Sequence, residues 1–506
     1  MGPLSFGWTL FASPFGLSPA ATATLAGTLW LATWWVTEAI PIPATSLLPV
    51  VLFPTTGVTG VAKTTAPYAD PVVFLLLGGF LLAVGIERWG VHRRVALTVV
   101  TAVGLQSDRL LLGIMVSTAL LSMWVSNSAT AMLMLPVGAA VTAALDPDAT
   151  WRPDEIPPDE TPLDGDALGA SASGEDHVST GAVDGTVGAK RSPQTRFGLA
   201  TMLGIAYAAS IGGVATPVGS PPNAVFVGVV GSQLGIEVTF LDWLSFAGPL
   251  AAVFLLVSWG LLTALLRPTL PDGVGTEVVL RRRREALGPP SRGERRVLAV
   301  VAVVAAGWLL RPVLVAPVVP GASDAVVAIA GGVALFVVPA GDGERRRLLT
   351  WTDAARLPWG VLLLLGGGLS LANAMQTSGL DTAVARALAG LGTLPVVGLV
   401  AAFAAVVVFL TEVTSNTATA AVFVPIAITL GPSLGVPPVT LAATVALAAS
   451  FAFMLPVATP PNAVVFASGY VTAGQMSRVG FWLNLLAIAA LVATTYLWLP
   501  IALAPP

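Results

Sequence analysis

The chain has 506 residues, of which 55% are hydrophobic and 10% charged, and its net charge is −3. Soluble globular domains usually carry about 25% charged residues, so this composition argues against a water-soluble fold. The chain contains no cysteine, which excludes disulfides, thiolate metal sites and a thiol nucleophile.

Apolar runs close to the ~20 residues needed to cross hydrocarbon recur along the chain. Examples lie at 199–214, 243–266, 297–310 and 481–503. They do not alternate at period two as the strands of a membrane barrel do. We therefore predict an all-α polytopic protein of the inner (cytoplasmic) membrane, with about 10–11 transmembrane helices. Residues 1–19 resemble a short first span interrupted by Pro14, and no removable signal peptide is expected.

The first polar interruption lies within the apolar segment 110–141, at Ser126-Asn127-Ser128. Asn and Ser favour local hydrogen bonds outside helices, so we expect a broken helix here. Irregular backbone at membrane depth is tolerated only where it is buried in protein or lines a wet cavity. Ser122 and Ser126 are four residues apart, which predicts one shared helix face.

Polar loops follow. The segment 146–196 is rich in Asp, Glu, Pro and Gly without periodicity, and we expect it to be disordered. The loop 267–296 carries four consecutive arginines at 281–284, which places it in the cytoplasm, as does the basic run at 345–347 two spans later.

Three sequence motifs, one glycine-rich and two polar, each occur twice. The segment 73–81 (VFLLLGGFL) shares seven of nine positions with 361–369 (VLLLLGGGL). Ser126-Asn127-Ser128 corresponds to Ser415-Asn416-Thr417, and the segment 217–225 (PVGSPPNAV) corresponds to 456–464 (PVATPPNAV). Duplicated halves with interrupted apolar segments are typical of secondary transporters whose site lies between the repeats. An odd number of crossings between equivalent motifs would invert the second half.

Hydroxyls, amides and unwound carbonyls are hard oxygen ligands of the kind that sodium prefers. Thr411 and Ser415 repeat the four-residue spacing of the first pair. The proline pairs lack N–H donors and bar regular helix, which frees carbonyls near Gly219 and Ala458. Helix N-termini at the breaks could bind a small anion. Ser, Asn and Thr can also serve as interhelical hydrogen-bonding groups. Helix packing alone, however, offers no obvious reason for the same polar residues to occur in both halves.

Glu38 and Glu412 lie in or beside apolar sequence, where a carboxylate is by default a functional candidate. Glu412 directly follows Thr411, so we expect it to point away from the Thr411/Ser415 face. We interpret both carboxylates as structural or interfacial.

These residues resemble the divalent anion:sodium symporter family of dicarboxylate, citrate and sulfate carriers. The resemblance covers the whole chain, from the segment 34–41 (WWVTEAIP) through the Gly78-Gly79 and Gly366-Gly367-Gly368 pairs to both Pro-Pro-Asn segments. It implies an elevator-type homodimer with inverted repeats, broken helices and re-entrant hairpins that begin near Val72 and Trp359. One departure is Ser128, where dicarboxylate carriers commonly have threonine.

The resemblance also implies ligands for two coupling sodium ions and no other cofactor. The first sodium would be held by Ser122, Ser126, Asn127 and the Gly219 carbonyl, and the second by Thr411, Ser415, Asn416 and the Ala458 carbonyl. The anion would be bound by Asn127, Ser128, Asn416, Thr417, Thr459 and Pro460. The expected partners are a small dianion, sodium, the lipid bilayer and a second copy of the chain, with no nucleic acid.

The resemblance divides the chain into scaffold and transport regions. We expect scaffold helices at 1–71, a first hairpin and broken helix at 72–145, the acidic cytoplasmic loop at 146–197 and the first Pro-Pro-Asn segment at 198–230. Scaffold helices with Arg-rich loops follow at 231–350, the second hairpin, broken helix and Pro-Pro-Asn segment at 351–470, and a C-terminal helix at 471–506.

The predicted function is sodium-coupled uptake of a small divalent anion, with a C4-dicarboxylate favoured. The alternatives are a sulfate or other oxyanion symporter, and a sodium-independent exchanger or proton-coupled carrier on the same fold. Loss of the hydroxyl pairs would favour the exchanger, and both pairs are present. An intramembrane enzyme is disfavoured because no histidine, cysteine or carboxylate pair lies within an apolar segment. A sensor would be expected to bring a soluble domain, and the acidic loop has too little apolar content to be one.

Overall fold

The computed structural model describes residues 1–13, 16–104, 106–145, 195–268, 284–341, 346–388 and 395–499. The predicted disorder of the acidic loop concerns residues that lie almost entirely outside these ranges. Arg345 and three of the four consecutive arginines at 281–284 also lie outside these ranges. The described chain is helical, with a single isolated bridge between Pro339 and Arg347.

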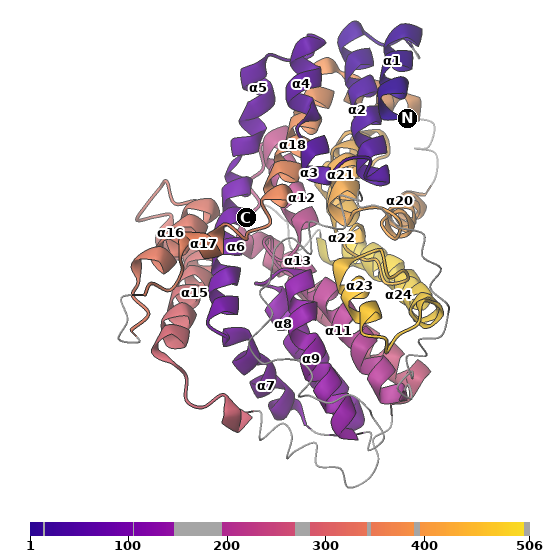
Figure 1. The fold of residues 1–506 in the computed structure, drawn as a ribbon. Coiled ribbons are helices and arrows are strands. Elements are labelled where there is room, and N and C mark those ends of the chain that lie inside the picture. The colour runs from indigo at the N-terminus through magenta and orange to yellow at the C-terminus, as the bar shows by residue number, and fades with distance from the viewer. Residues whose placement is uncertain are drawn as a thin grey trace, which may run out of the picture.

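The helices before the acidic loop divide into short N-terminal elements and longer helices (Figure 1). In chain order they are α1 (Gly2–Ala12), α2 (Pro19–Thr37), α3 (Ile42–Thr45), α4 (Leu48–Thr55), α5 (Val61–Thr65), the 3₁₀ turn η2 (Ala66–Ala69), α6 (Pro71–Arg88), α7 (Val91–Val103), α8 (Ser107–Ser122) and α9 (Asn127–Leu145).

The remaining helices carry the second half of the protein. They are α11 (Arg196–Val214), α12 (Pro221–Leu234), α13 (Phe240–Leu266), α15 (Arg292–Leu310), α16 (Asp324–Val337), α17 (Trp351–Ala354), α18 (Trp359–Ser378), α19 (Leu380–Leu388), α20 (Val396–Leu410), α21 (Asn416–Ser433), α22 (Pro438–Ala448), α23 (Pro460–Ala467) and α24 (Ala473–Ala493). Single π-turns extend α15 over Arg311–Val315 and α24 over Thr494–Trp498.

Six helices in the described ranges are long and apolar enough to cross a bilayer, and five shorter apolar helices accompany them. The long ones are Val61–Arg88, Arg196–Val214, Phe240–Leu266, Arg292–Val315, Trp359–Ser378 and Ala473–Trp498. Helix α11 lies at the centre, with every residue from Phe197 to Val214 buried. The prediction of an all-α polytopic membrane protein is confirmed.

Helices α8 and α9 form a hairpin against α11. On α8, Leu111 and Met115 lie beside Gly204, and Ala119 lies beside Gly212, so α8 and α11 run in the same direction. On α9, Asn127 lies beside Gly213 and Thr142 beside Gly198, so α9 runs in the opposite direction. The predicted break at Ser126 is therefore the tip of a hairpin.

The second half repeats these elements in the same order. Helix α20 ends at Leu410, α21 begins at Asn416, and a short turn joins α21 to α22 so that these two helices run in opposite directions. The two halves also exchange partners: α12 packs on α21 and α22, while its counterpart α23 packs on α9 and α11. Reciprocal packing of this kind is what a pseudo-twofold axis between two repeats produces.

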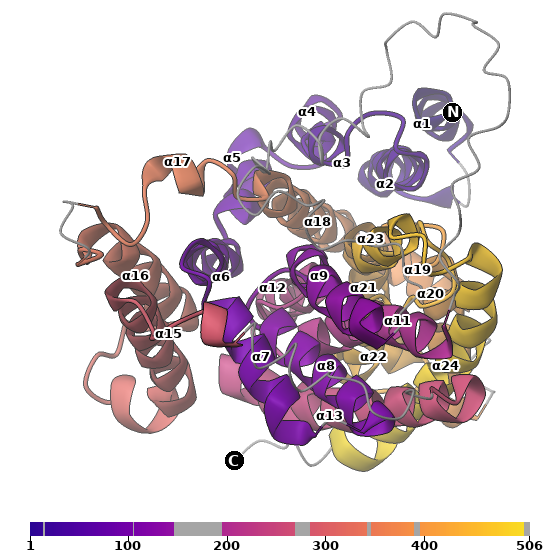
Figure 2. The same cartoon turned by 60° about the horizontal axis from the view of Figure 1, so that its bottom comes forward.

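The two glycine-rich segments do not form the re-entrant hairpins that we expected near Val72 and Trp359. Both lie inside continuous helices, α6 and α18. Their glycines allow close helix packing: a Cβ on Gly78 would overlap Ala328 of α16, and a Cβ on Gly367 would overlap the Ser46 carbonyl. Figure 2 shows α15 and α16 as a pair set apart from the other helices, with α6 beside them.

Candidate functional site

The first candidate site is formed where the hairpin tip meets α11. Helix α8 ends at Ser122, and α9 begins five residues later at Asn127. The buried Ser122 hydroxyl lies 2.7 Å from Asn127 Oδ1 and 2.7 Å from the Ala209 carbonyl oxygen. A hydroxyl has a single proton, so it cannot donate fully to both oxygens.

Further oxygens surround the Asn127 amide. The amide position that holds Oδ1 lies 3.1 Å from the Ala209 carbonyl oxygen and 3.3 Å from the Gly219 carbonyl oxygen. Two arrangements remove the repulsion between these acceptors. Either the amide rotates so that its nitrogen donates to the carbonyls, or a cation is bound among the oxygens. Ser122, Asn127 and the Gly219 carbonyl, three of the four predicted ligands of the first sodium, are therefore brought together.

The loop between α11 and α12 is held in place by side chains. Asn223 donates to the carbonyl oxygens of Gly213, Val214 and Thr216, at 2.9, 3.3 and 2.8 Å. The Thr216 hydroxyl donates to the Met123 carbonyl at 2.7 Å and accepts from the Gly219 N–H at 3.0 Å. These bonds fix the unwound segment that exposes the Gly219 carbonyl to Asn127.

The second candidate site has the same framework. The buried Thr411 hydroxyl lies 2.7 Å from Asn416 Oδ1 and 2.9 Å from the Ala449 carbonyl oxygen, as Ser122 does with Asn127 and Ala209. Asn462 donates to the Ala452 and Leu455 carbonyls at 3.3 and 3.0 Å, as Asn223 does in the first repeat. No hydrogen bond of the described residues joins the fourth predicted ligand, the Ala458 carbonyl, to Asn416.

The assumption that Ser122/Ser126 and Thr411/Ser415 share a helix face is wrong. Both helices end before the second member of the pair, because the backbone unwinds there. Ser126 and Ser415 lie at the starts of the following helices, where their hydroxyls accept from the N–H groups of Ala129 and Ala418. The partner in each repeat is instead the asparagine, five residues after the hydroxyl.

The predicted anion ligands lie at helix N-termini. Ser128 and Thr417 occupy the first turns of α9 and α21. Thr459 caps α23 by accepting from the Asn462 N–H at 3.3 Å, and Pro460 is the exposed first residue of that helix. Free N–H groups at such termini favour bound anions.

The sequence did not identify several residues that form the two oxygen clusters or hold the loops beside them. The Ala209 and Ala449 carbonyls carry no residue-type signal, since any residue offers a carbonyl. Asn223 and Asn462 did have a signal, because the Pro-Pro-Asn segment is duplicated. Glu412, which follows Thr411, is buried and accepts hydrogen bonds from the loop after α22.

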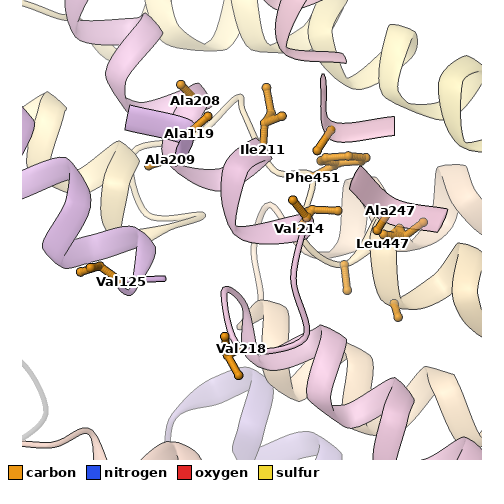
Figure 3. Packing of buried hydrophobic residues seen from close by; sticks show 14 of the residues in the cluster. Ala119, Val125, Ala208, Ala209, Ile211, Val214, Val218, Ala247, Leu447 and Phe451 are labelled. Atoms are coloured by element: carbon orange, nitrogen blue, oxygen red, sulfur yellow. The ribbon is translucent and has the colours of Figure 1, made fainter. Parts of the chain in front are cut away.

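Both clusters are formed from neutral oxygens in apolar surroundings. Figure 3 shows Ala119 of α8 beside Ala208 and Ala209 of α11, with Val214 and Phe451 close to the loop that carries Val218. Within the described ranges, no group of three or more His, Asp or Glu side chains could hold a metal ion. A cation bound here would depend on hydroxyl, amide and carbonyl oxygens.

Comparison with known proteins gives consistent results across the whole chain. Residues 6–504 match the family described as the sodium:sulfate symporter transmembrane region. The chain is 37% identical over 511 residues to the sodium-dependent dicarboxylate transporter SdcS of Staphylococcus saprophyticus, covering 99% of this chain and 90% of that protein. It is also 37% identical over 508 residues to SdcS of Staphylococcus aureus strain USA300, covering 99% and 91%.

Two solved transporters share the fold at low sequence identity. The YdaH transporter of Alcanivorax borkumensis has a TM-score of 0.54 and 14% identity, covering 93% of this chain and 98% of that one. MtrF of Neisseria gonorrhoeae has a TM-score of 0.55 and 14% identity, covering 97% and 96%. These two structures show the fold alone. The family model and the staphylococcal relatives show that the protein is a multi-pass membrane transporter rather than an enzyme. The match over nearly all of its length shows that the chain belongs to the sodium:sulfate symporter family, the divalent anion:sodium symporters that its duplicated motifs resemble.

Proposed function

We propose that this protein couples sodium entry to uptake of a small divalent anion, with a C4-dicarboxylate as the expected substrate. The observation that carries the proposal is the convergence of the Ser122 hydroxyl, the Asn127 amide and the Ala209 and Gly219 carbonyls at one buried point. Hydroxyl, amide and carbonyl oxygens of this kind would supply the hard, neutral ligands that sodium prefers. The names of the staphylococcal relatives support both the ion and the substrate class.

The anion would bind between the two hairpin tips. Ser128 and Thr417 offer hydroxyls in the first turns of α9 and α21, and Asn127 and Asn416 offer amides. Neutral donors can bind a dianion without the cost of burying a permanent charge. Two sodium ions would neutralise one dianion, so an inward current would require a further cation.

We also propose an elevator movement, in which the unit that carries both hairpins moves against a scaffold. The packing favours a scaffold that contains α6, α15 and α16, because α6 lies along α16. That would place α6 in the scaffold, although the division expected from sequence begins the transport region at residue 72. Helix α13 contacts both units: Trp243 donates to the Val214 carbonyl of α11 at 2.9 Å, and Phe240, its first residue, donates to Asp324 of α16 at 2.6 Å.

A homodimer is proposed on the family resemblance, and the mass of the detergent-solubilised protein would test it. The scaffold helix α15 would be available to a partner or to lipid, because it leaves apolar residues such as Val303 exposed. These exposed side chains fit either neighbour equally well.

The decisive experiment is uptake of radiolabelled succinate and sulfate into proteoliposomes with and without an inward sodium gradient. It compares the wild type with the double variant Asn127→Ala/Asn416→Ala. Sodium-dependent uptake that is lost in the double variant is expected, and the better substrate identifies the anion class. Equal uptake in sodium and choline would overturn sodium coupling and favour an exchanger.

A further inference from the structure

A buried carboxylate lies at the tip of the second hairpin. Glu412 is 3% exposed, and both of its carboxylate oxygens accept hydrogen bonds. Oε1 accepts from the Phe453 and Met454 N–H groups and from Asn484 Nδ2, at 2.7, 2.9 and 2.7 Å. Oε2 accepts from the Met454 and Leu455 N–H groups at 3.1 and 3.0 Å. Every partner is a donor, which suits an ionised carboxylate.

The three N–H groups belong to an unwound stretch that leads to the second Pro-Pro-Asn segment. Helix α22 ends at Ala448 and α23 begins at Pro460. A Cβ on Gly480 of α24 would overlap the Phe453 backbone, so α24 packs directly on this stretch. The Ala458 N–H donates to the Leu455 carbonyl at 3.2 Å. Glu412 is therefore connected to the Ala458 N–H through one residue, Leu455.

The first repeat makes the equivalent connection with the opposite chemistry. Met123 occupies the position that corresponds to Glu412, and Thr216 occupies the position that corresponds to Leu455. There, the loop side chain of Thr216 donates to the hairpin carbonyl of Met123. In the second repeat, the hairpin side chain of Glu412 accepts from the loop backbone. Both repeats thus tie the hairpin tip to the loop, but only the second uses a charge.

We infer that Glu412 is a positioning residue for the second sodium site. It holds the 453–455 stretch, and through it the Ala458 carbonyl, at the distance from Thr411 and Asn416 that sodium binding requires. This inference rests on the proposed sodium coupling. It goes beyond that proposal because it assigns a role in ion affinity to a side chain that touches neither ion nor substrate.

The test measures the sodium concentration that gives half-maximal succinate uptake, for the wild type and for Glu412→Gln. Glutamine keeps the size of the side chain but turns one acceptor into a donor that faces N–H groups. Hydrogen bonds to charged groups contribute enough that their loss should raise half-saturating sodium at least about tenfold. The KM for succinate at saturating sodium should change much less. The sodium-induced rise in Tm of the purified protein should shrink in parallel.

Asp324→Asn is the matched control. Asp324 is also a buried carboxylate that accepts a backbone N–H, from Phe240 at 2.6 Å, but its partners Phe240, Trp308 and Arg311 include no predicted sodium or anion ligand. It should lower the Tm in choline without changing the sodium dependence. Asn484→Leu removes one donor from Glu412 and provides a milder variant, with a smaller rise in half-saturating sodium, if Glu412→Gln does not fold.

Wild-type sodium dependence in Glu412→Gln, or in Asn484→Leu where only that variant folds, would overturn the inference while leaving the proposed function intact. Equal shifts in Glu412→Gln and Asp324→Asn would also overturn it, because the effect would then be one of general stability. Sodium-independent uptake by the wild type would overturn the proposed function and this inference with it.

Discussion

Gly213 offers a way to disturb the proposed first sodium site without removing any of its predicted ligands. A Cβ at this position would overlap the Asn127 amide, which lies against the bare glycine backbone. Added atoms in a well-packed interior cost about 1–3 kcal/mol. If Gly213→Ala displaces Asn127 from the Ser122 and Gly219 oxygens, half-saturating sodium should rise roughly 5- to 150-fold.

The assay is a sodium titration of succinate uptake in proteoliposomes. Gly231→Ala is the matched control, because a Cβ there would have only the Ile236 carbonyl oxygen within 4 Å, at 3.9 Å. Alanine favours helix by about 0.5–1 kcal/mol over glycine, so the control should be at least as stable as the wild type with unchanged sodium dependence. An unchanged sodium curve in Gly213→Ala would refute the contact between Asn127 and α11 on which the site depends.

Three further predictions address movement, pH and substrate choice. Trp124 at the hairpin tip stacks on Trp308 of α15 with ring centroids 6.2 Å apart, so a cleavable thiol crosslink in Trp124→Cys/Trp308→Cys should stop uptake until it is cleaved. Burial lowers the pKa of His92, at the start of α7, to about 4. Because the unfolded pKa is about 6.5, the wild type should lose up to roughly 3 kcal/mol of stability relative to His92→Leu as the pH falls from 6.5 to 4. Ser128→Thr adds a methyl group and should raise the succinate-to-sulfate uptake ratio by about fourfold if that methyl contacts the carbon chain.

Each of these has a clear contrary result. The chain has no native cysteine, so full uptake by the crosslinked protein would mean that α15 and the hairpin tip do not separate during transport. Thermal melts would measure the stability of the wild type and of His92→Leu between pH 6.5 and 4. Equal losses of stability in the two proteins would contradict a depressed pKa of His92. An unchanged substrate ratio in Ser128→Thr would place that side chain away from the anion.

The positions of the helix breaks could be predicted because residue type carries the signal. Ser, Asn and Pro in apolar sequence indicate helix breaks or polar sites, because unsatisfied polar groups in hydrocarbon cost free energy. Their duplication predicted matched positions at Asn127 and Asn416. The direction of the chain after each break could not be predicted. A broken helix and a hairpin tip have the same local sequence, and only the packing of α8 and α9 on α11 distinguishes them. For that reason the glycine-rich helices α6 and α18 were wrongly expected to hold the hairpins.

The ligand geometry was predictable only in part. The four-residue spacing assumed a continuous helix through Ser126, but the same polar residues that form the site unwind the backbone there. The i, i+4 rule does not apply where the helix unwinds. In each repeat the asparagine, rather than the second hydroxyl, lies beside the first hydroxyl. The carbonyls of Ala209 and Ala449 come from helices far along the chain, so no local pattern indicates them.

The differences between the repeats are as informative as their identities. The hydroxyl–asparagine pair and the loop asparagine are kept in both halves, which is what two sites for the same ion would need. The tie between hairpin and loop differs, with Thr216 in one half and Glu412 in the other. If both halves did the same work throughout transport, a buried charge in one of them would add desolvation cost for no gain. Under the proposed sodium coupling, the charge at Glu412 would therefore hold the second loop more firmly than Thr216 holds the first.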